Sequence, residues 1–285
     1  DDDTAGGGQI EIVASGDIDQ TGGSLNSNDD STKITSGGAV TIRDIDSNGA
    51  NSIAKQGTLP GGSVAVTIRG DSVTMVDTGA DNINANNGDM EVFADSGEIQ
   101  LGDVTASGQT VFLEASSDIT DNNGSSTNVT ANKLDASAAG LIGDTGDDVT
   151  NNPGDGGFDA LETQVSQLDA ITTAANSDIA IDNSGSALML APGGSADLDP
   201  ASGGTGFLWV RNDNDITVSG WTIDNNDSVG LIATSGNVTI PDGGAGVIGM
   251  NGDITNPDIS VGTGDVKLSA ASGGVQDSAS GALEI

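Results

Sequence analysis

Short runs of alternating apolar residues recur along the chain, and their spacing limits the possible folds more than any other feature. Examples are Ile10–Ile12, Val40–Ile42 and Val266–Leu268, where apolar residues occupy every second position. Each run has the length and period of a β-strand, and Gly, Asn, Asp or Ser residues bound it. Successive runs mostly begin about 20–26 residues apart, so the chain carries a degenerate repeat of strands and turns.

A repeat of this size predicts an all-β chain, a parallel β-helix (β-solenoid) of roughly 11–13 coils. One unit cannot bury an apolar face alone, but stacked units form a continuous column of aliphatic side chains. Such a narrow core agrees with an aromatic content of 2%. Asn, Ser and Thr at equivalent turns are expected to stack as hydrogen-bonded ladders. A β-sandwich or barrel is the second interpretation, although its hairpins favour two-residue Asn-Gly or Asp-Gly turns.

Composition alone would favour disorder, because the net charge is -36 and only 34% of residues are hydrophobic. The regular placement of the apolar residues argues against it. We therefore interpret residues 1–285 as a single β-solenoid domain with an irregular, acidic, insertion-like stretch at about 135–178. Within that stretch Leu161, Val165 and Leu168 fit one helical face, whereas Leu161, Thr163 and Val165 fit strand alternation. Both a short helix and a strand–turn–strand remain open there.

The segment from Gly140 to Leu190 resembles a recurring block of the large secreted exoproteins of the filamentous-haemagglutinin type. In that family a Gly-x-Ile-Gly turn precedes Leu-x-Thr-x-Val-x-x-Leu-x-Ala, then Gly-x-Ile-x-Ile and a Leu-x-Leu strand. The chain reads GLIGDTGDD, later LETQVSQLDA and SDIAID, so Ser177 and Asp178 replace the usual Gly before Ile179. The segments 8–20, 229–240 and 264–275 look like the family's ordinary coils.

The resemblance implies a right-handed parallel β-helix that is exported and displayed at the cell surface as a shaft for adhesion or cohesion. We therefore expect an extracellular or cell-surface location. The sequence starts at Asp1 without Met or a signal peptide, and it ends in the strand-like Ala282–Ile285. Neither end reads as a polar cap. We expect a processed product or an excerpt of a longer shaft, with ends able to stack on other copies.

The residue types that are missing exclude several classes of function. The chain has no His and no Cys, which removes the Ser-His-Asp triad, the imidazole base, disulfides and cysteine metal sites. Only seven Lys and Arg stand against 43 Asp and Glu, so nucleic acid and anionic membrane surfaces would be repelled. No apolar run approaches the ~18–20 residues that span a bilayer. Other copies of the chain, or host or cell-surface glycans, are the expected partners.

Carboxylates are the only abundant groups for catalysis, and Asp144, Asp147 and Asp148 form a cluster. Paired carboxylates hydrolyse glycosidic bonds, and pectinase-like β-helix hydrolases use clustered Asp. Those enzymes also carry a Gly-His-Gly element, which this chain lacks. Lyase chemistry would need a Lys or Arg base beside calcium, and the arginines stand in unlike sequence contexts (Arg43, Arg69 and Arg211). We therefore expect a solvated acidic loop, no catalytic residue and no enzymatic activity.

Calcium is the only cofactor with some support in the sequence. Gly154–Leu161 partly matches the calcium-binding nonapeptide repeat, with Asp155 where Gly is expected. Tandem copies complete such sites, and only one copy occurs here. A plain acidic loop is the favoured interpretation, calcium at the acidic Gly-rich loops is the alternative, and no cofactor-binding or metal-binding residue is assigned.

Trp209 and Trp221 lie close in sequence to Phe207, and together they could form a stacking platform for sugar. Alternation within Phe207–Val210 sends one pair of side chains inward, so packing is the favoured role. The sequence as a whole predicts a structural, non-enzymatic segment of a secreted adhesin or extracellular filament. A polysaccharide-binding or polysaccharide-degrading β-helix is the alternative.

Overall fold

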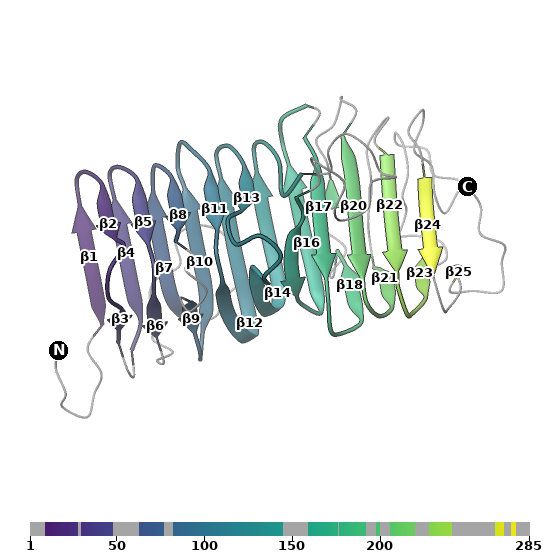
Figure 1. Cartoon of the computed structure of the whole chain (residues 1–285), viewed down its shortest axis with the longest axis horizontal. Helices are drawn as coiled ribbons and strands as arrows, with labels where there is room; N and C mark the ends of the chain where they lie inside the picture. Colours follow the sequence, from purple (N-terminus) through teal and green to yellow (C-terminus); the bar gives the residue numbers. More distant parts are fainter. Residues whose placement is uncertain are drawn as a thin grey trace. The chain divides into compact units, whose positions relative to one another are not determined.

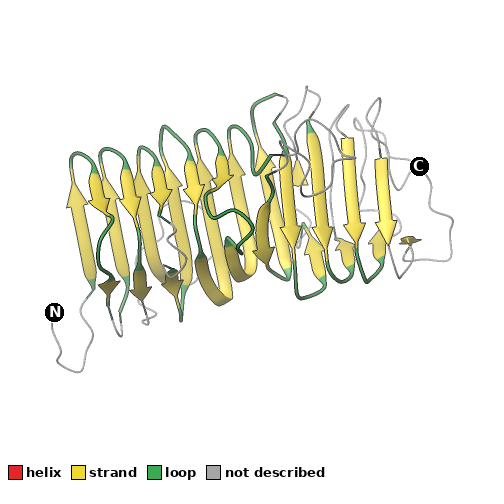
Figure 2. Cartoon of the chain, viewed as in Figure 1, coloured by secondary structure: helices red, strands yellow, loops and turns green. Residues whose placement is uncertain are grey.

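In a computed structural model, the described residues of the chain form strands joined by turns (Figures 1 and 2). Residues 1–135 and residues 136–285 form two compact units. The interpretation of residues 1–285 as one domain stays a prediction. The described residues are 9–27, 30–47, 63–76, 82–144, 159–175, 177–191, 198–199, 206–219, 228–240, 266–270 and 275–277.

The strands of the first unit recur in a fixed order and pair in three parallel ladders. The first ladder is β1–β4–β7–β10–β12, the second is β2–β5–β8–β11–β13, and the third is β3–β6–β9–β12. The strands are β1 (Ile10–Ala14), β2 (Ile18–Gln20), β3 (Leu25–Asn26), β4 (Thr32–Ser36), β5 (Val40–Ile42), β6 (Ile45–Ser47), β7 (Val64–Gly70), β8 (Val73–Met75), β9 (Ile83–Ala85), β10 (Asp89–Ala94), β11 (Ile99–Leu101), β12 (Val104–Ala115) and β13 (Ile119–Asp121). β14 (Val129–Ala138) follows and crosses into the second unit.

Aliphatic residues of the first unit line up in rows across successive strands. The row through β1, β4, β7, β10 and β12 contains Ile12, Ile34, Ile68, Val92 and Leu113. The last four are buried, as are the next aliphatic residues two positions away in the later strands. Each strand therefore contributes its alternate side chains to one stacked core, as the sequence pattern predicts.

The second unit repeats this plan with two long parallel ladders. They are β15–β17–β20–β22–β24 and β16–β18–β21–β23–β25, and β16 also pairs with β19. One row joins five buried or half-buried aliphatic residues: Leu161, Ile181, Val210, Leu231 and Leu268. The strands are β15 (Leu161–Gln164), β16 (Gln167–Thr172), β17 (Ile179–Asn183), β18 (Leu188–Leu190), β19 (Leu198–Asp199), β20 (Phe207–Asn212), β21 (Ile216–Val218), β22 (Ser228–Ala233), β23 (Val238–Ile240), β24 (Val266–Ala270) and β25 (Val275–Asp277).

The stretch that the sequence left open between a helix and two strands is a strand–turn–strand, β15 followed by β16. Leu161, Thr163 and Val165 are buried, so alternation rather than helical periodicity places them. Asp144 and Asp159 flank residues 145–158, which lie outside the described residues. Their backbones exchange a pair of 2.8 Å hydrogen bonds in an antiparallel bridge. This bridge joins the two ends of the acidic stretch.

Buried polar side chains form ladders at equivalent turns, as the sequence predicts. In the second unit Asn183 donates from Nδ2 to Asn212 Oδ1 at 2.8 Å, and Thr163 donates from Oγ1 to Asn183 Oδ1 at 2.8 Å. In the first unit the hydroxyl of Ser47 lies 2.9 Å from Ser27 Oγ and 2.7 Å from Thr32 Oγ1. These bonds satisfy polar groups that would otherwise be buried without partners.

The described architecture is all-β and mostly parallel. The pairings of both units are parallel throughout the ladders given above, which departs from the antiparallel hairpins of a sandwich or barrel. Across the described residues, no helix has the length and apolar character to cross a membrane.

Candidate functional site

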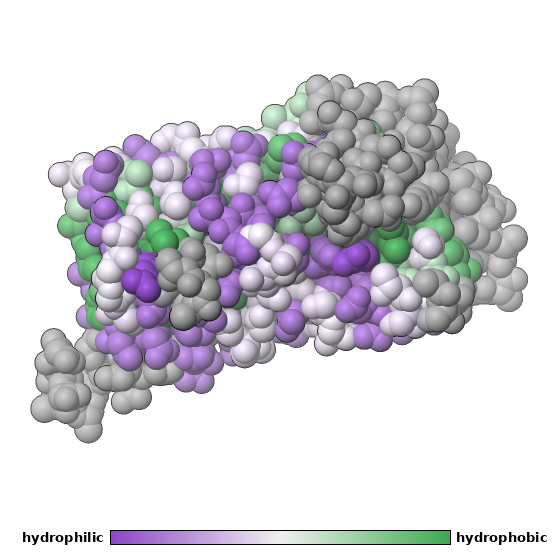
Figure 3. All heavy atoms as spheres, viewed as in Figure 1, coloured by the Kyte–Doolittle hydropathy of each residue, from purple (hydrophilic) through white to green (hydrophobic). Residues whose placement is uncertain are grey.

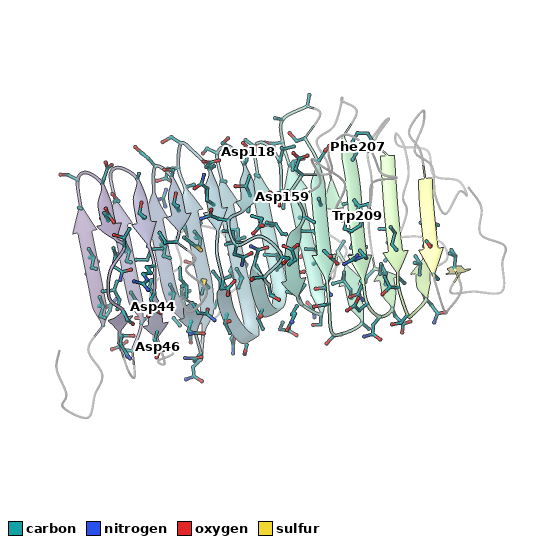
Figure 4. The ribbon with its side chains drawn as sticks, in the orientation of Figure 1. Asp44, Asp46, Asp118, Asp159, Phe207 and Trp209 are labelled. Carbon is teal, nitrogen blue, oxygen red and sulfur yellow. The ribbon has the colours of Figure 1, made fainter. Side chains whose placement is uncertain are left out.

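The acidic cluster considered for glycosidic hydrolysis is only partly within the described residues. Asp144 is described and its backbone is tied to Asp159, whereas Asp147 and Asp148 lie outside. Of the possible calcium segment, Asp159 and the buried Leu161 are described, and Gly154–Phe158 lie outside. Within the described ranges no group of three or more acidic, His or Cys side chains is arranged to hold a metal ion. Figure 4 labels Asp159 where the chain re-enters the strands.

Gly143 sets the geometry at the base of this loop. Its φ is 64°, and a Cβ on it would lie 2.5 Å from the carbonyl oxygen of Ala180. Glycine is therefore required twice, once for the left-handed backbone and once for the close approach of β17. Gly143 is therefore held against β17, directly before Asp144.

Gly143→Ala is expected to lower the free energy of unfolding by about 2–3 kcal/mol, because backbone strain and overpacking add. Gly23→Ala is the matched control. Gly23 has φ of 79° but nothing within 4 Å of the added Cβ, so we expect only about 1 kcal/mol there. Urea unfolding followed by circular dichroism measures both. Equal losses would show that β17 does not constrain the loop base.

The aromatic residues of β20 are the next candidates. Leu208 and Val210 occupy the aliphatic rows, so Phe207 and Trp209 point to the other face of the strand. Trp209 nevertheless has only 1% of its surface exposed, and it packs with Ala160, Ala180 and Ile232. This confirms the packing role for Trp209, while Phe207 is half-buried and Trp221 lies outside the described residues. Figure 4 labels Phe207 and Trp209 on β20.

Arg69 and Arg211, which were considered for lyase chemistry, form ion pairs on separate strands. Arg69 of β7 donates from Nε to Asp95 at 2.8 Å, and its guanidinium lies 5.5 Å from the centre of the Phe93 ring. Arg211 of β20 donates two hydrogen bonds to Asp182 of β17, and the one from Nε to Oδ1 is 2.7 Å long. Arg43 lies in the turn after β5, where its backbone N–H donates to Gln20 Oε1 at 2.9 Å. Arg69 and Arg211 thus lie on different strands, and Arg43 lies in a turn.

Asp182 is the more buried acid of these pairs, with 14% of its side chain exposed. Burial raises the pKa of Asp182 above its ordinary value, while the hydrogen bond and the charge of Arg211 oppose the rise. The carboxylate is therefore costly to keep charged, and Arg211 offsets part of that cost.

Arg211→Met is expected to lower the free energy of unfolding at pH 7 by about 1–3 kcal/mol, because it leaves a buried carboxylate without its cation. The pKa of Asp182 is already raised, so its folded form gains a proton more readily than its unfolded form as the pH falls. The loss should therefore shrink between pH 7 and pH 4. Arg69→Met is the control, since Asp95 is 44% exposed and the expected loss is under about 1 kcal/mol. Urea denaturation at pH 7 and pH 4 measures the free energy of unfolding of both variants. Equal losses for Arg211→Met and Arg69→Met at each pH would contradict the prediction.

An outward row of the first unit is buried, contrary to what alternation in the sequence predicts. Thr67, Glu91 and Phe112 form one outward row, Phe93 stands in the next, and all four are buried. Alternation places these side chains away from the aliphatic column, so the sequence predicts them on the surface. The available signal was the pair of phenylalanines at outward positions of neighbouring strands, Phe93 and Phe112. This face of β7, β10 and β12 is packed and offers no open site at those residues.

Comparison with protein-family models, with characterised proteins and with solved structures found no significant match to this chain. Function therefore has to be inferred from its own ladders, burial and charges.

Proposed function

We propose that the chain is a structural, non-enzymatic segment of a secreted, surface-exposed β-helical adhesin or extracellular filament. The observation that supports this most is the set of in-register parallel ladders, which run through each unit with aliphatic rows inside. In such ladders nearly every described strand pairs with a neighbouring strand of the same ladder. Arg69 and Arg211 of the described chain each hold a carboxylate on a neighbouring segment, as pairs that support the strands.

For the fold we propose a right-handed parallel β-helix of roughly 11–13 coils. The support is the fixed recurrence of three strands in the first unit, where β1, β2 and β3 are followed by β4, β5 and β6 in the same three ladders. A chain that winds once per three strands produces this recurrence. The handedness rests on the resemblance to the haemagglutinin-type exoproteins.

Other copies of the chain, or cell-surface glycans, are the partners we propose. A net charge of -36 keeps such a shaft hydrated and repels nucleic acid. Hydrophilic residues cover much of the described surface in Figure 3. Calcium bound at the acidic Gly-rich loops would reduce the self-repulsion without being required for folding.

The alternative is a polysaccharide-binding or polysaccharide-degrading β-helix. The burial of Trp209 weighs against an aromatic sugar platform on β20. The missing histidine weighs against the pectinase-like hydrolase.

Electron microscopy of the purified chain, together with a turnover assay on acidic and neutral polysaccharides, tests the proposal. We expect rods, with a single chain on the order of 50–60 Å long at the ~4.8 Å spacing of strands. No release of reducing ends or unsaturated products is expected. Round particles would contradict the shaft, and product release that rises with protein concentration would establish the enzyme instead.

A further inference from the structure

Two strand pairs are the outermost described strands of the ladders, and the side of each that pairs with no described strand is called its open edge. β1 and β2 pair with β4 and β5 on one side, and no described residue pairs with their other side (Figure 1). β24 and β25 pair in the same way with β22 and β23 alone among the described strands. An open strand edge is a template for pairing with another chain.

Hydrophobic residues reach the surface at these edges. Ile10, Ile12 and Ile18 are half-buried, whereas their row partners in later strands are buried. Three large hydrophobic residues of the described chain are exposed, and two of them lie on the edge strands: Val13 (68%) in β1 and Val275 (36%) in β25. The hydrophobic colour at the β1 end is visible in Figure 3. Natural proteins ordinarily protect such edges with charge, proline or a covering segment.

We propose that the β24–β25 edge of one copy pairs in parallel with the β1–β2 edge of a second copy. This inference rests on the proposed structural function and specifies the partner and the contact. The two edges are different surfaces, so the contact is heterologous and leaves one edge of each kind open. Repetition of the contact then gives a filament.

The rows of the two edges match. Val266, Leu268 and Ala270 repeat the aliphatic–aliphatic–Ala pattern of Ile10, Ile12 and Ala14. With these rows level, Val275 stands level with Ile18, although the interval from Leu268 to Val275 is one residue longer than that from Ile12 to Ile18. The chain already stacks such intervals, because β10 and β11 lie on β12 and β13 with Val92 level with Leu113 and Ile99 level with Ile119.

The backbone directions at the β1 edge fit this register. Ile10 N–H donates to Ser31 C=O, and Ala14 C=O accepts from Gly37 N–H. The even-numbered residues of β1 therefore direct their backbone N–H and C=O groups toward β4. In parallel pairing the residues between them face the opposite side. Glu11 and Val13 therefore turn their N–H and C=O groups to the open edge.

The backbone directions at the β24 edge are complementary. Thr234 N–H donates to Asn212 C=O, which assigns the even-numbered residues of β22 to β20 and the odd-numbered ones to β24. By the same alternation, Leu268 and Ala270 face the open edge of β24. In the proposed register Val13 N–H donates to Leu268 C=O, and Ala270 N–H donates to Val13 C=O.

Charge along the matched rows is also complementary. Lys267 stands at the register position level with Glu11, the position that Lys33 holds on the other side of Glu11. Lys33 Nζ lies 3.0 Å from Glu11 Oε1. Net repulsion between copies still opposes association at low salt, so assembly is expected to strengthen as salt screens the charge.

Proline substitutions at the two edges test the contact, because the N–H groups that they remove face away from the neighbouring strand. Val13→Pro removes an N–H that points to the open edge, and Ala270→Pro does the same at the other edge. Val13→Ala and Ala270→Ser are matched controls that keep the N–H. Sedimentation velocity at low and high salt measures assembly, and circular dichroism checks that each variant is folded. We expect each proline to weaken assembly at least tenfold, and the controls to assemble within about threefold of the unmodified chain.

Mixing the two proline variants distinguishes the contact from other kinds of association. Each variant retains one intact edge of opposite kind, so an equimolar mixture should form dimers and stop there. Longer assemblies in the mixture, or equal effects of the prolines and their controls, would overturn the proposed register. An unmodified chain that stays monomeric at every salt and protein concentration would overturn the contact altogether. Single rods without polysaccharide turnover would still leave the structural function standing.

Discussion

Trp209→Ala should destabilise the second unit by about 3–5 kcal/mol, the largest loss expected from any single change considered for this chain. The indole is almost fully buried on the outward face of β20. The residues level with it are Ala180 on β17 and Gly230 on β22, so neither neighbour has a side chain that could fill the space. The truncation would leave a cavity and remove the packing against Ala160 and Ile232.

Phe207→Ala is the control for this prediction, because Phe207 lies two residues away on the same face of β20 and is half-buried. We expect a loss of about 1–2 kcal/mol for it, in proportion to the smaller buried area. Urea titration followed by far-ultraviolet circular dichroism compares the two. Suppose that Trp209→Ala lost no more unfolding free energy than Phe207→Ala, and that it also abolished binding to a glycan array. The packing role would then be wrong, and a sugar-binding role for Trp209 would be supported.

Alternation in the sequence was sufficient to predict many of the strands and their inward faces. Val40, Ile68 and Val92 are buried at the positions where period two places them. The exact register was not predictable from this pattern. Rows require only an aliphatic residue, and the segments between paired strands differ in length, as from Thr32 to Val66 and from Met90 to Val111. Backbone pairing between neighbouring strands decides which aliphatic residue joins which row.

Alternation predicts the side of a sheet that a residue occupies, but not what covers that side. Glu91 and Trp209 are both outward-facing and both buried, whereas the outward-facing Val13 is exposed, and alternation places all three alike. The base of the acidic loop was unpredictable for a related reason. The Asp144–Asp159 bridge and the approach of Gly143 to Ala180 join residues that are distant in sequence.

Asn183→Ala should lower the free energy of unfolding by about 3–4 kcal/mol, because several buried partners lose their hydrogen bonds together. Asn183 Oδ1 accepts from Val165 N–H at 2.9 Å and from Thr163 Oγ1 at 2.8 Å. Its Nδ2 donates to Val165 C=O at 3.1 Å and to Asn212 Oδ1 at 2.8 Å. Alanine would leave the Val165 backbone groups and the Asn212 carbonyl buried without these partners.

Asn214→Ala provides the comparison, since Asn214 is exposed and its Nδ2 donates to the backbone carbonyl of Gly185 at the surface. Water replaces that partner, so the expected loss is under about 1 kcal/mol. A double variant, Asn183→Ala with Asn212→Ala, should cost less than the sum of the two single changes, because the pair shares one hydrogen bond. Additive losses in urea unfolding would mean that the two asparagines stabilise their turns separately. The ladder would then not link β17 to β20.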